Sequence, residues 1–325
     1  MTRLDLERGQ VWIYLAAIAA GLLTGSALPG SAPALAALLW PALMVLLYAT
    51  FVQVPLLHLR AAFADHRFVA AALTGNFVLV PLVVAALASL LPPDPALRLG
   101  VLLVLLVPCT DWFITFSQLG RGDTPRAIAV TPLNLLLQLL LLPVYLWLMG
   151  GAGVTGALTP ARAAPALAIV LLPLAAAALS ERWIEARPQR AAVRETLAWW
   201  PVPLLALVVF LIAGAQVAAL GTALAAVPRV VPLFAAYLLL AALLARRLAT
   251  LFRLPAPQGR TLAFSLGTRN SFVVLPFALT LPPGWEVAAV VIVIQSLVEL
   301  FGMVAYLIWI PRRLFPDPPA GRPAG

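Results

Sequence analysis

Ten apolar stretches, each close to the length that a helix needs to cross a membrane, follow one another along the 325-residue chain. A membrane-crossing helix needs about 20 such residues. Backbone polar groups inside a bilayer must be paired within the protein, so this pattern predicts a bundle of helices. The predicted spans are residues 11–28, 34–57, 68–91, 97–119, 126–149, 162–180, 197–219, 229–249, 260–281 and 286–310.

The composition supports an integral membrane protein. With 63% hydrophobic and only 10% charged residues, the chain has too little polar surface to cover a soluble globule of this size. A single cysteine excludes an internal disulfide framework and a multi-cysteine metal site. No Ala-x-Ala cleavage site follows a short apolar core, so we expect the segment from Val11 to be a retained first helix. The sequence predicts no cofactor and no nucleic-acid partner.

The arginines predict the orientation of the spans. The sequence has no lysine, and 17 of its 21 basic residues lie at the two ends or in the even-numbered joins between spans. Only Arg98, Arg162 and Arg229 lie in the odd-numbered joins, and Arg269 lies inside a span. Basic residues collect on the cytoplasmic side of membrane proteins. We therefore expect both termini to be cytoplasmic, in a bacterial-type inner membrane.

Two of the spans contain interruptions. Pro108 lies in the middle of the fourth span, and a proline removes a backbone donor and clashes with the preceding turn. The segment Ser265–Ser271 interrupts the ninth span in a similar way. Paired interruptions at membrane depth are typical of transporter binding sites. The sequence therefore predicts a carrier with broken, crossing helices 4 and 9 at its centre.

The two halves of the chain share a pattern of polar residues. Asn134 and Gln138 are four residues apart in the fifth span, and Gln295 and Glu299 are four apart in the tenth. Because each half has five crossings, two copies would enter the membrane from opposite sides. We therefore expect an all-α membrane protein with two inverted five-helix repeats, residues 1–160 and 161–325, forming one transporter domain. Chance placement of polar residues is the alternative.

Three ionisable residues lie at membrane depth: Asp111, Arg269 and Glu299. Each charge at a helix centre costs roughly 2.5–3.5 kcal/mol on insertion scales, so such residues are rare and usually functional. The least costly arrangement pairs Arg269 with Asp111 or Glu299 and leaves one carboxylate free to carry a proton. A static ion pair that only fastens two helices is the alternative.

Cys109 follows the helix-breaking proline and precedes Thr110 and Asp111. A buried thiol is often only a small packing residue. A thiolate also binds soft species such as trivalent arsenic or antimony, and a single sulfur binds them weakly and reversibly. Both interpretations remain open from the residues alone.

The sequence resembles the arsenite efflux permeases of the bile acid/sodium symporter superfamily over nearly its whole length. The fourth-span resemblance lies in Pro108-Cys109-Thr110, Ser117 and Gly122-Asp123, and the tenth-span resemblance in Val298-Glu299. The segment Gly267–Ser271 resembles the broken ninth helix of the superfamily. Ten spans in two inverted repeats are the shared architecture of that superfamily.

The resemblance implies that Cys109 contacts a metalloid and that Glu299 is needed for export. The sequence departs from the permeases at Asp111 and Trp112, where small and apolar residues are usual. It also departs from them after Asn270, where they usually carry a glutamate and this chain has Phe272, Val273 and Val274. It departs from the sodium-coupled members at Ser265, in place of a glutamate, and at Arg269, in place of a glutamine. A fixed guanidinium supplies the charge that a sodium ion would bring, so proton coupling is expected.

The leading expectation is export of arsenite or a related trivalent metalloid by proton antiport. The alternative is a carrier of a small organic anion whose carboxylate binds Arg269. A sensor or a membrane-embedded enzyme is a third possibility, disfavoured because the chain has no separate soluble domain and no catalytic cluster. The expected substrate-binding residues are Cys109, Thr110, Asp111, Thr268, Arg269, Asn270 and Ser271. The expected coupling residues are Glu299, Asp111, Asn134, Gln138 and Gln295. The expected partners are the lipid membrane, the substrate and protons, and the oligomeric state stays open.

Overall fold

The computed structural model describes residues 3–58, 65–217 and 220–317, and this part of the chain is helical, without strands. Residues 1–2, part of the predicted join between the second and third spans, the last two residues of the predicted seventh span and the end of the C-terminal segment lie outside the described residues. The long helices are α1 (Arg3–Ala27), α2 (Ala32–Phe51), α8 (Thr124–Ala157), α9 (Pro160–Glu185), α11 (Pro201–Ala215), α12 (Leu220–Leu251) and α15 (Val287–Trp309). The shorter helices are α4 (His66–Thr74), α5 (Val80–Ala88), α6 (Pro95–Leu105), α7 (Trp112–Leu119), α10 (Ala191–Leu197), α13 (Ala256–Gly267) and α14 (Ser271–Leu279). One-turn helices are η1 (Pro29–Ser31), η2 (Leu56–His58), η3 (Gly75–Leu79), η4 (Pro188–Arg190) and η6 (Ile310–Leu314).

Eight helical stretches are long and apolar enough to cross a membrane. They confirm an all-helical integral membrane protein. The predicted fourth and ninth spans are each divided into two short helices, α6 with α7 and α13 with α14. The first break follows from Pro108, which cannot continue the helix that enters from Pro95. The full ten-span arrangement of inverted repeats goes beyond these eight helices and stays a prediction.

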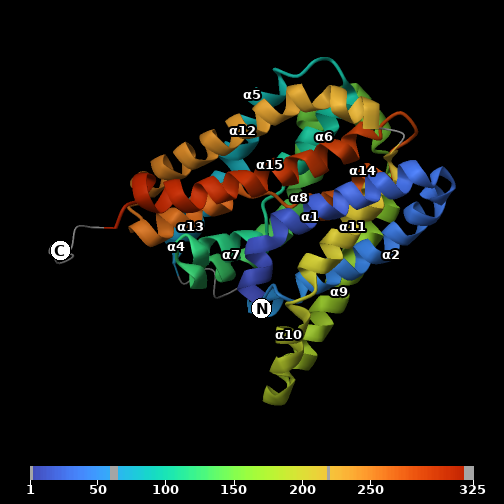
Figure 1. Ribbon diagram of the computed structural model, residues 1–325. Helices are drawn as coiled ribbons and strands as arrows, with labels where there is room; N and C mark the ends of the chain where they lie inside the picture. Colours follow the sequence, from blue (N-terminus) through green and yellow to red (C-terminus); the bar gives the residue numbers. More distant parts are fainter. Residues whose placement is uncertain (1–2, 59–64, 218–219, 318–325) are drawn as a thin grey trace.

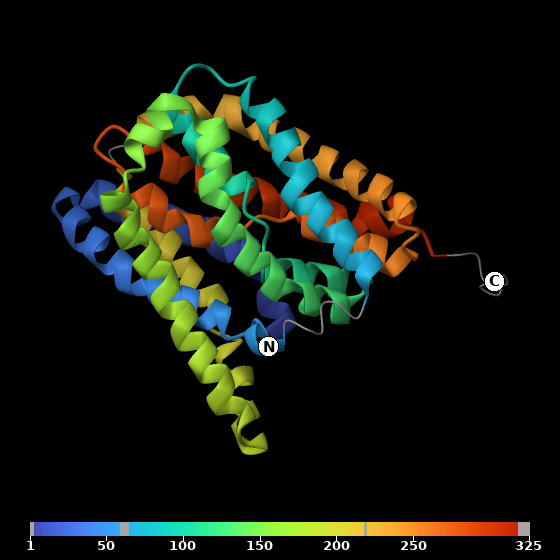
Figure 2. The ribbon, with the colours of Figure 1, turned by 180° about the vertical axis from the view of Figure 1, so that it is seen from behind.

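The helices form two groups that do not coincide with the two halves of the sequence. One group contains α1, α2, α9 and α11, and the other is built around α15, which packs on α12 and α6 (Figures 1 and 2). In the first group, Gly21 and Gly25 of α1 lie so close to α11 that a Cβ at either position would overlap a carbonyl oxygen of α11. Small residues permit such close approach between helices in membranes. Each group thus combines helices from before and after residue 160.

Three even-numbered joins meet at one end of the molecule. Asp65, which caps α4, accepts hydrogen bonds from Arg126 Nε at 2.5 Å and Gln258 Nε2 at 3.0 Å. Arg126 also donates to Asp123, the cap of α8. Partial burial acts to raise the pKa of Asp65. The hydrogen bonds from the Phe68 N–H and from Arg126 outweigh it, so this pKa lies below its ordinary value. The network places these joins on one side, as the positive-inside prediction requires.

Candidate functional site

The two helix breaks meet in the interior and complete each other's backbone hydrogen bonds. Pro108 and Arg269 form an antiparallel bridge. The Cys109 N–H donates to the Thr268 carbonyl at 3.2 Å, and the Asn270 N–H donates to the Val107 carbonyl at 2.8 Å. Open backbone groups at membrane depth need such partners, because lipid offers none. The breaks predicted from the sequence therefore lie in direct contact.

Side chains extend this contact between the breaks. Asn270 Nδ2 donates to Thr110 Oγ1 at 3.0 Å, and both residues are buried. The other amide atom of Asn270, Oδ1, accepts from the Val273 N–H at 3.4 Å and so caps the start of α14. One asparagine thus ends the second break and joins it to the first. The Thr268 hydroxyl does not take part in this contact between the breaks. It donates to the Phe264 carbonyl within α13.

The Arg269 guanidinium binds neutral oxygens at the ends of the broken helices. Nη2 lies 2.9 Å from Asn76 Oδ1, 2.9 Å from the Ser265 carbonyl and 2.8 Å from the Leu266 carbonyl. Nη1 donates to the Leu105 carbonyl at 3.3 Å. The last carbonyls of a helix have no partner within the helix and carry its negative dipole end. These oxygens bind both terminal nitrogens of the guanidinium, whereas its Nε is buried without a hydrogen-bond partner.

The predicted ion pair of Arg269 with Glu299 does not form in the structure. The carboxylate of Glu299 meets the backbone of Arg269 and not its guanidinium. Glu299 Oε2 instead accepts from the backbone N–H of Arg269 at 2.8 Å and from Gln295 Nε2 at 2.7 Å. Gln295 Oε1 accepts in turn from the Ser271 hydroxyl at 3.0 Å. The other oxygen of Glu299 is buried and has no hydrogen-bond partner.

Asn134 and Gln138 lie apart from this network. Both side chains are buried on α8, and none of their amide nitrogens and oxygens has a hydrogen-bond partner. Their counterparts in the proposed repeat, Gln295 and Glu299, are paired with each other. The structure thus joins one of the two expected polar pairs by a hydrogen bond and leaves the side-chain amides of the other without hydrogen bonds. Unpaired buried amides usually bind water, an ion or a ligand.

Cys109 lies beside Asp111, which lines a cavity. The thiol is buried, and Sγ lies 3.0 Å from Asp111 Oδ1 as a hydrogen-bond donor. Asp111 lines a cavity of about 320 Å³ between the two groups of helices. The other polar side chains that line the cavity are Gln10, Thr50, Gln53, Thr115 and Arg194. The cavity reaches the first break through Asp111, and none of the lining residues belongs to the second break.

Two residues at which the sequence departs from the arsenite permeases lie against each other. Trp112 contacts Phe272 edge to face, with ring centroids 5.8 Å apart. The other face of Trp112 stacks on Tyr14 of α1 at 6.1 Å. Aromatic pairs at these separations contribute about 0.5–1.5 kcal/mol beyond their burial. Trp112 thus joins the two breaks through Phe272 and connects them to α1 through Tyr14.

Two members of the site were not predicted. Asn76 is fully buried in η3, and its Nδ2 donates to Ser265 Oγ while its Oδ1 accepts from Arg269. Tyr237 donates to the Leu266 carbonyl at 2.7 Å, and its ring centroid lies 5.6 Å from the Arg269 guanidinium carbon. Asn76 had a detectable signal, since it is the only amide or charged residue between Phe68 and Leu91. Tyr237 had none, because tyrosine is also common at membrane interfaces.

The comparison with known proteins decides the family. Residues 40–223, more than half of the chain, match the sodium bile acid symporter family. The chain belongs to this family. Members of the sodium bile acid symporter family are transporters and not enzymes, and the apolar helices of the chain make it integral to the membrane. A segment of 119 residues is 35% identical to the uncharacterized protein PA2026 of Pseudomonas aeruginosa. The match covers 35% of each chain, about a third of the length of that relative.

Proposed function

We propose that this symporter-family protein exports arsenite or a related trivalent metalloid in exchange for protons. One observation carries the proposal: the Cys109 thiol donates to Asp111, and Asp111 lines the cavity. The thiol is the soft ligand that trivalent arsenic prefers. A solute in the cavity therefore meets a carboxylate first and a sulfur next. The resemblance to the arsenite permeases supports the same assignment.

The chemistry at Cys109 balances without an added reactant. Arsenous acid carries hydroxyl groups on arsenic. When sulfur binds arsenic, one arsenic–oxygen bond breaks, and the thiol proton leaves with the hydroxyl as water. Asp111 is placed to accept the thiol proton and pass it to the departing hydroxyl. The reverse reaction releases the metalloid, and a single sulfur keeps the binding weak enough for transport.

The proposed coupling of transport to protons rests on Glu299 and Arg269. Glu299 is buried with one oxygen unpaired, which suits a residue that binds and releases a proton. The Arg269 guanidinium fills a cluster of oxygens that could otherwise bind a small cation. We therefore expect transport to respond to a proton gradient and to be independent of sodium. The expected orientation is an inner-membrane protein with both termini cytoplasmic, built from the repeats 1–160 and 161–325.

A second candidate, transport of an organic carboxylate, is favoured by the cavity itself. Its volume of about 320 Å³ exceeds what a metalloid needs and lies in the range of small-molecule sites. Arg194 lines it, and two of its guanidinium nitrogens, Nε and Nη2, have no hydrogen-bond partner. Arg269, the expected carboxylate ligand, is already engaged by Asn76 and three carbonyls. Arg194 is therefore the better anion ligand in this second candidate.

Replacement of Cys109 distinguishes the two candidates. In everted vesicles, Cys109→Ser should reduce proton-driven arsenite accumulation to the background level, because a hydroxyl cannot replace sulfur as a ligand for arsenic. Uptake of labelled carboxylates serves as the parallel assay, in which Arg194→Gln should be the defective variant. Full arsenite transport by Cys109→Ser would contradict the metalloid assignment.

A further inference from the structure

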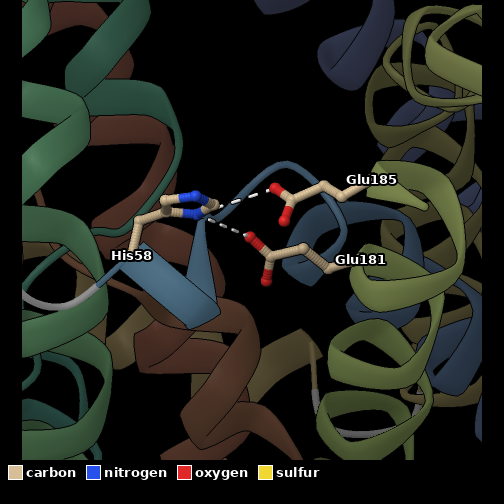
Figure 3. A group of neighbouring side chains, drawn as sticks. All are labelled: His58, Glu181 and Glu185. Atoms are coloured by element: carbon tan, nitrogen blue, oxygen red, sulfur yellow. Dashed lines mark ion pairs between the residues drawn. The ribbon is translucent and has the colours of Figure 1, made fainter. Parts of the chain in front are cut away.

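A cluster of one imidazole and two carboxylates lies at the same end of the molecule as the joins, outside the site described above. His58 ends η2, and Glu181 and Glu185 lie one turn apart on α9 (Figure 3). His58 Nδ1 is 3.5 Å from Glu181 Oε1 and 3.6 Å from Glu185 Oε1. One ligand atom from each of the three residues lies within 4.8 Å of the others.

Glu181 shows that this cluster is more than a solvated acidic surface. Its side chain is only 1% exposed, and its Oε1 points toward the imidazole without a hydrogen-bond partner. Its Oε2 is held by the Leu57 N–H at 3.1 Å. A buried carboxylate oxygen without a partner is costly unless a proton or a metal ion satisfies it. One oxygen is thus fixed by the backbone, and the other remains available to a ligand.

We propose that His58, Glu181 and Glu185 bind a divalent transition-metal ion, with zinc as the best fit. In a tetrahedral zinc site with bonds of about 2.0–2.1 Å, neighbouring ligand atoms lie about 3.3–3.4 Å apart. The two distances from the imidazole nitrogen are close to this value. A nitrogen ligand disfavours magnesium and calcium, which prefer oxygen. The imidazole is 54% exposed, so an ion can reach the site and keep a water ligand.

Arg194 on α10 competes with the metal for the carboxylates. Its Nη2 lies 3.8 Å from Glu181 Oε1 and 4.0 Å from Glu185 Oε1, beyond hydrogen-bond distance in both cases. A divalent ion bound to the same oxygens repels the guanidinium. Arg194 also lines the cavity, so the metal drives this charge toward the cavity. The site therefore links metal binding to the charge at the cavity wall, whichever solute is carried.

The test is titration calorimetry of zinc into the full chain, purified in detergent and freed of any histidine tag. Saturable binding is expected, and it should weaken by at least about tenfold in His58→Gln and in Glu185→Gln. Glu185 is 38% exposed, so its replacement should not disturb folding. Arg194→Gln should bind zinc more tightly than the natural chain. Cobalt in place of zinc should show the visible absorption of a tetrahedral site.

Two matched controls use other residues of the same types. His66, the second of the two histidines, is exposed at the start of α4, and Glu195 is exposed on α10 beside Arg194. His66→Gln and Glu195→Gln should leave the zinc affinity unchanged. The proposal is overturned if the natural chain shows no saturable binding, or if His58→Gln binds as tightly as the natural chain. Weaker binding by Arg194→Gln would also overturn it, because the arginine would then hold the carboxylates in place.

Discussion

At the scale of single residues, the Arg269 guanidinium occupies a cluster of buried oxygens. Its Nη2 lies within 2.9 Å of three oxygens, from Asn76, Ser265 and Leu266. Oxygens arranged in this way around a positive charge also suit a small monovalent cation. The guanidinium is tethered to the chain and cannot leave with the substrate. A permanent positive charge therefore occupies this cluster of oxygens.

Removing this guanidinium should expose the oxygens. Arg269→Met keeps much of the stem and removes the guanidinium donor from Asn76 Oδ1 and from the Ser265 and Leu105 carbonyls, so we expect a loss on the order of 3 kcal/mol in stability. Sodium chloride, but not choline chloride at equal ionic strength, should restore part of the melting temperature, as measured by thermal unfolding in detergent. Arg260 is equally buried but binds Asp317 and two carbonyls in the joins. Arg260→Met is the control and should show no sodium rescue.

At the scale of elements, the two breaks act as one unit because each supplies what the other lacks. Asn270 caps α14 and donates to Thr110 across the junction. A cap of this kind is worth about 1 kcal/mol, and a buried side-chain hydrogen bond contributes a similar amount. Neither helix pair can shift along the other without losing these bonds together with the backbone bridge. These contacts therefore hold the two breaks together as one junction.

A double-mutant cycle measures this junction. Thr110→Val preserves shape and removes the acceptor, and Asn270→Ala removes both the cap and the donor. The two losses of stability should be non-additive by about 0.5–1.5 kcal/mol in denaturant unfolding, because both variants break the same bond. Thr280→Val, which removes only a local hydroxyl contact at the end of α14, is the control partner and should be additive with Thr110→Val. Additivity of Thr110→Val with Asn270→Ala would show that their hydrogen bond does not contribute.

The hydrogen bonds of Asp65 at the joins predict how the stability of the fold changes at low pH. Asp65 has a lowered pKa in the folded protein, so its ionised form stabilises the fold. This stabilisation is fully present above the unfolded pKa of about 3.9 and is lost as the pH falls through the lower folded value. Asp65→Asn should therefore reduce stability by about 1 kcal/mol at pH 7 and by less at pH 3, where part of this stabilisation is already lost. Melting curves in detergent at both pH values test this, and an equal loss at pH 3 would contradict it.

The sequence predicted the positions of the breaks but not all of the contacts inside them. Pro108 and the polar run around Arg269 are local signals, and the structure has a break at each. The partner of Arg269 could not be predicted in this way, since insertion costs favour a carboxylate. The carbonyls that bind the guanidinium become acceptors only once α6 and α13 have ended beside it. Asn76 was missed for a similar reason, because its contact with Arg269 joins residues 193 positions apart.

At the scale of the whole molecule, the even-numbered joins gather at one end. Asp65, Asp123 and Gln258 share the Arg126 network, and His58 meets Glu181 nearby in the same set of joins. The arginine distribution predicts that this end is cytoplasmic. The grouping of the joins is a property of the fold, whereas the side of the membrane is a prediction from charge.

Accessibility to a membrane-impermeant maleimide tests the orientation. In a Cys109→Ser background, Ser89→Cys lies directly after α5, next to an odd-numbered join, and should be labelled from outside the cell. Gln189→Cys lies in η4, in an even-numbered join, and should be labelled only in everted vesicles. Both positions are exposed, so a failure of labelling reports the membrane and not burial. The reverse pattern would invert the topology.

The bridge between the breaks also constrains how the protein is made. Thr110 and Asn270, which meet at the bridge, are 160 residues apart in the sequence. At about 5–20 residues per second, the ribosome needs about 10 to 30 seconds to pass from one to the other. Throughout that interval the Cys109 N–H and the Val107 carbonyl have no partner from the second break. An unpaired peptide group in hydrocarbon costs several kcal/mol, so the nascent first half must keep this segment beside water or the insertion machinery. The fold of the first half is thus finished by the last third of the chain, and a truncated product is left with an open helix in the membrane.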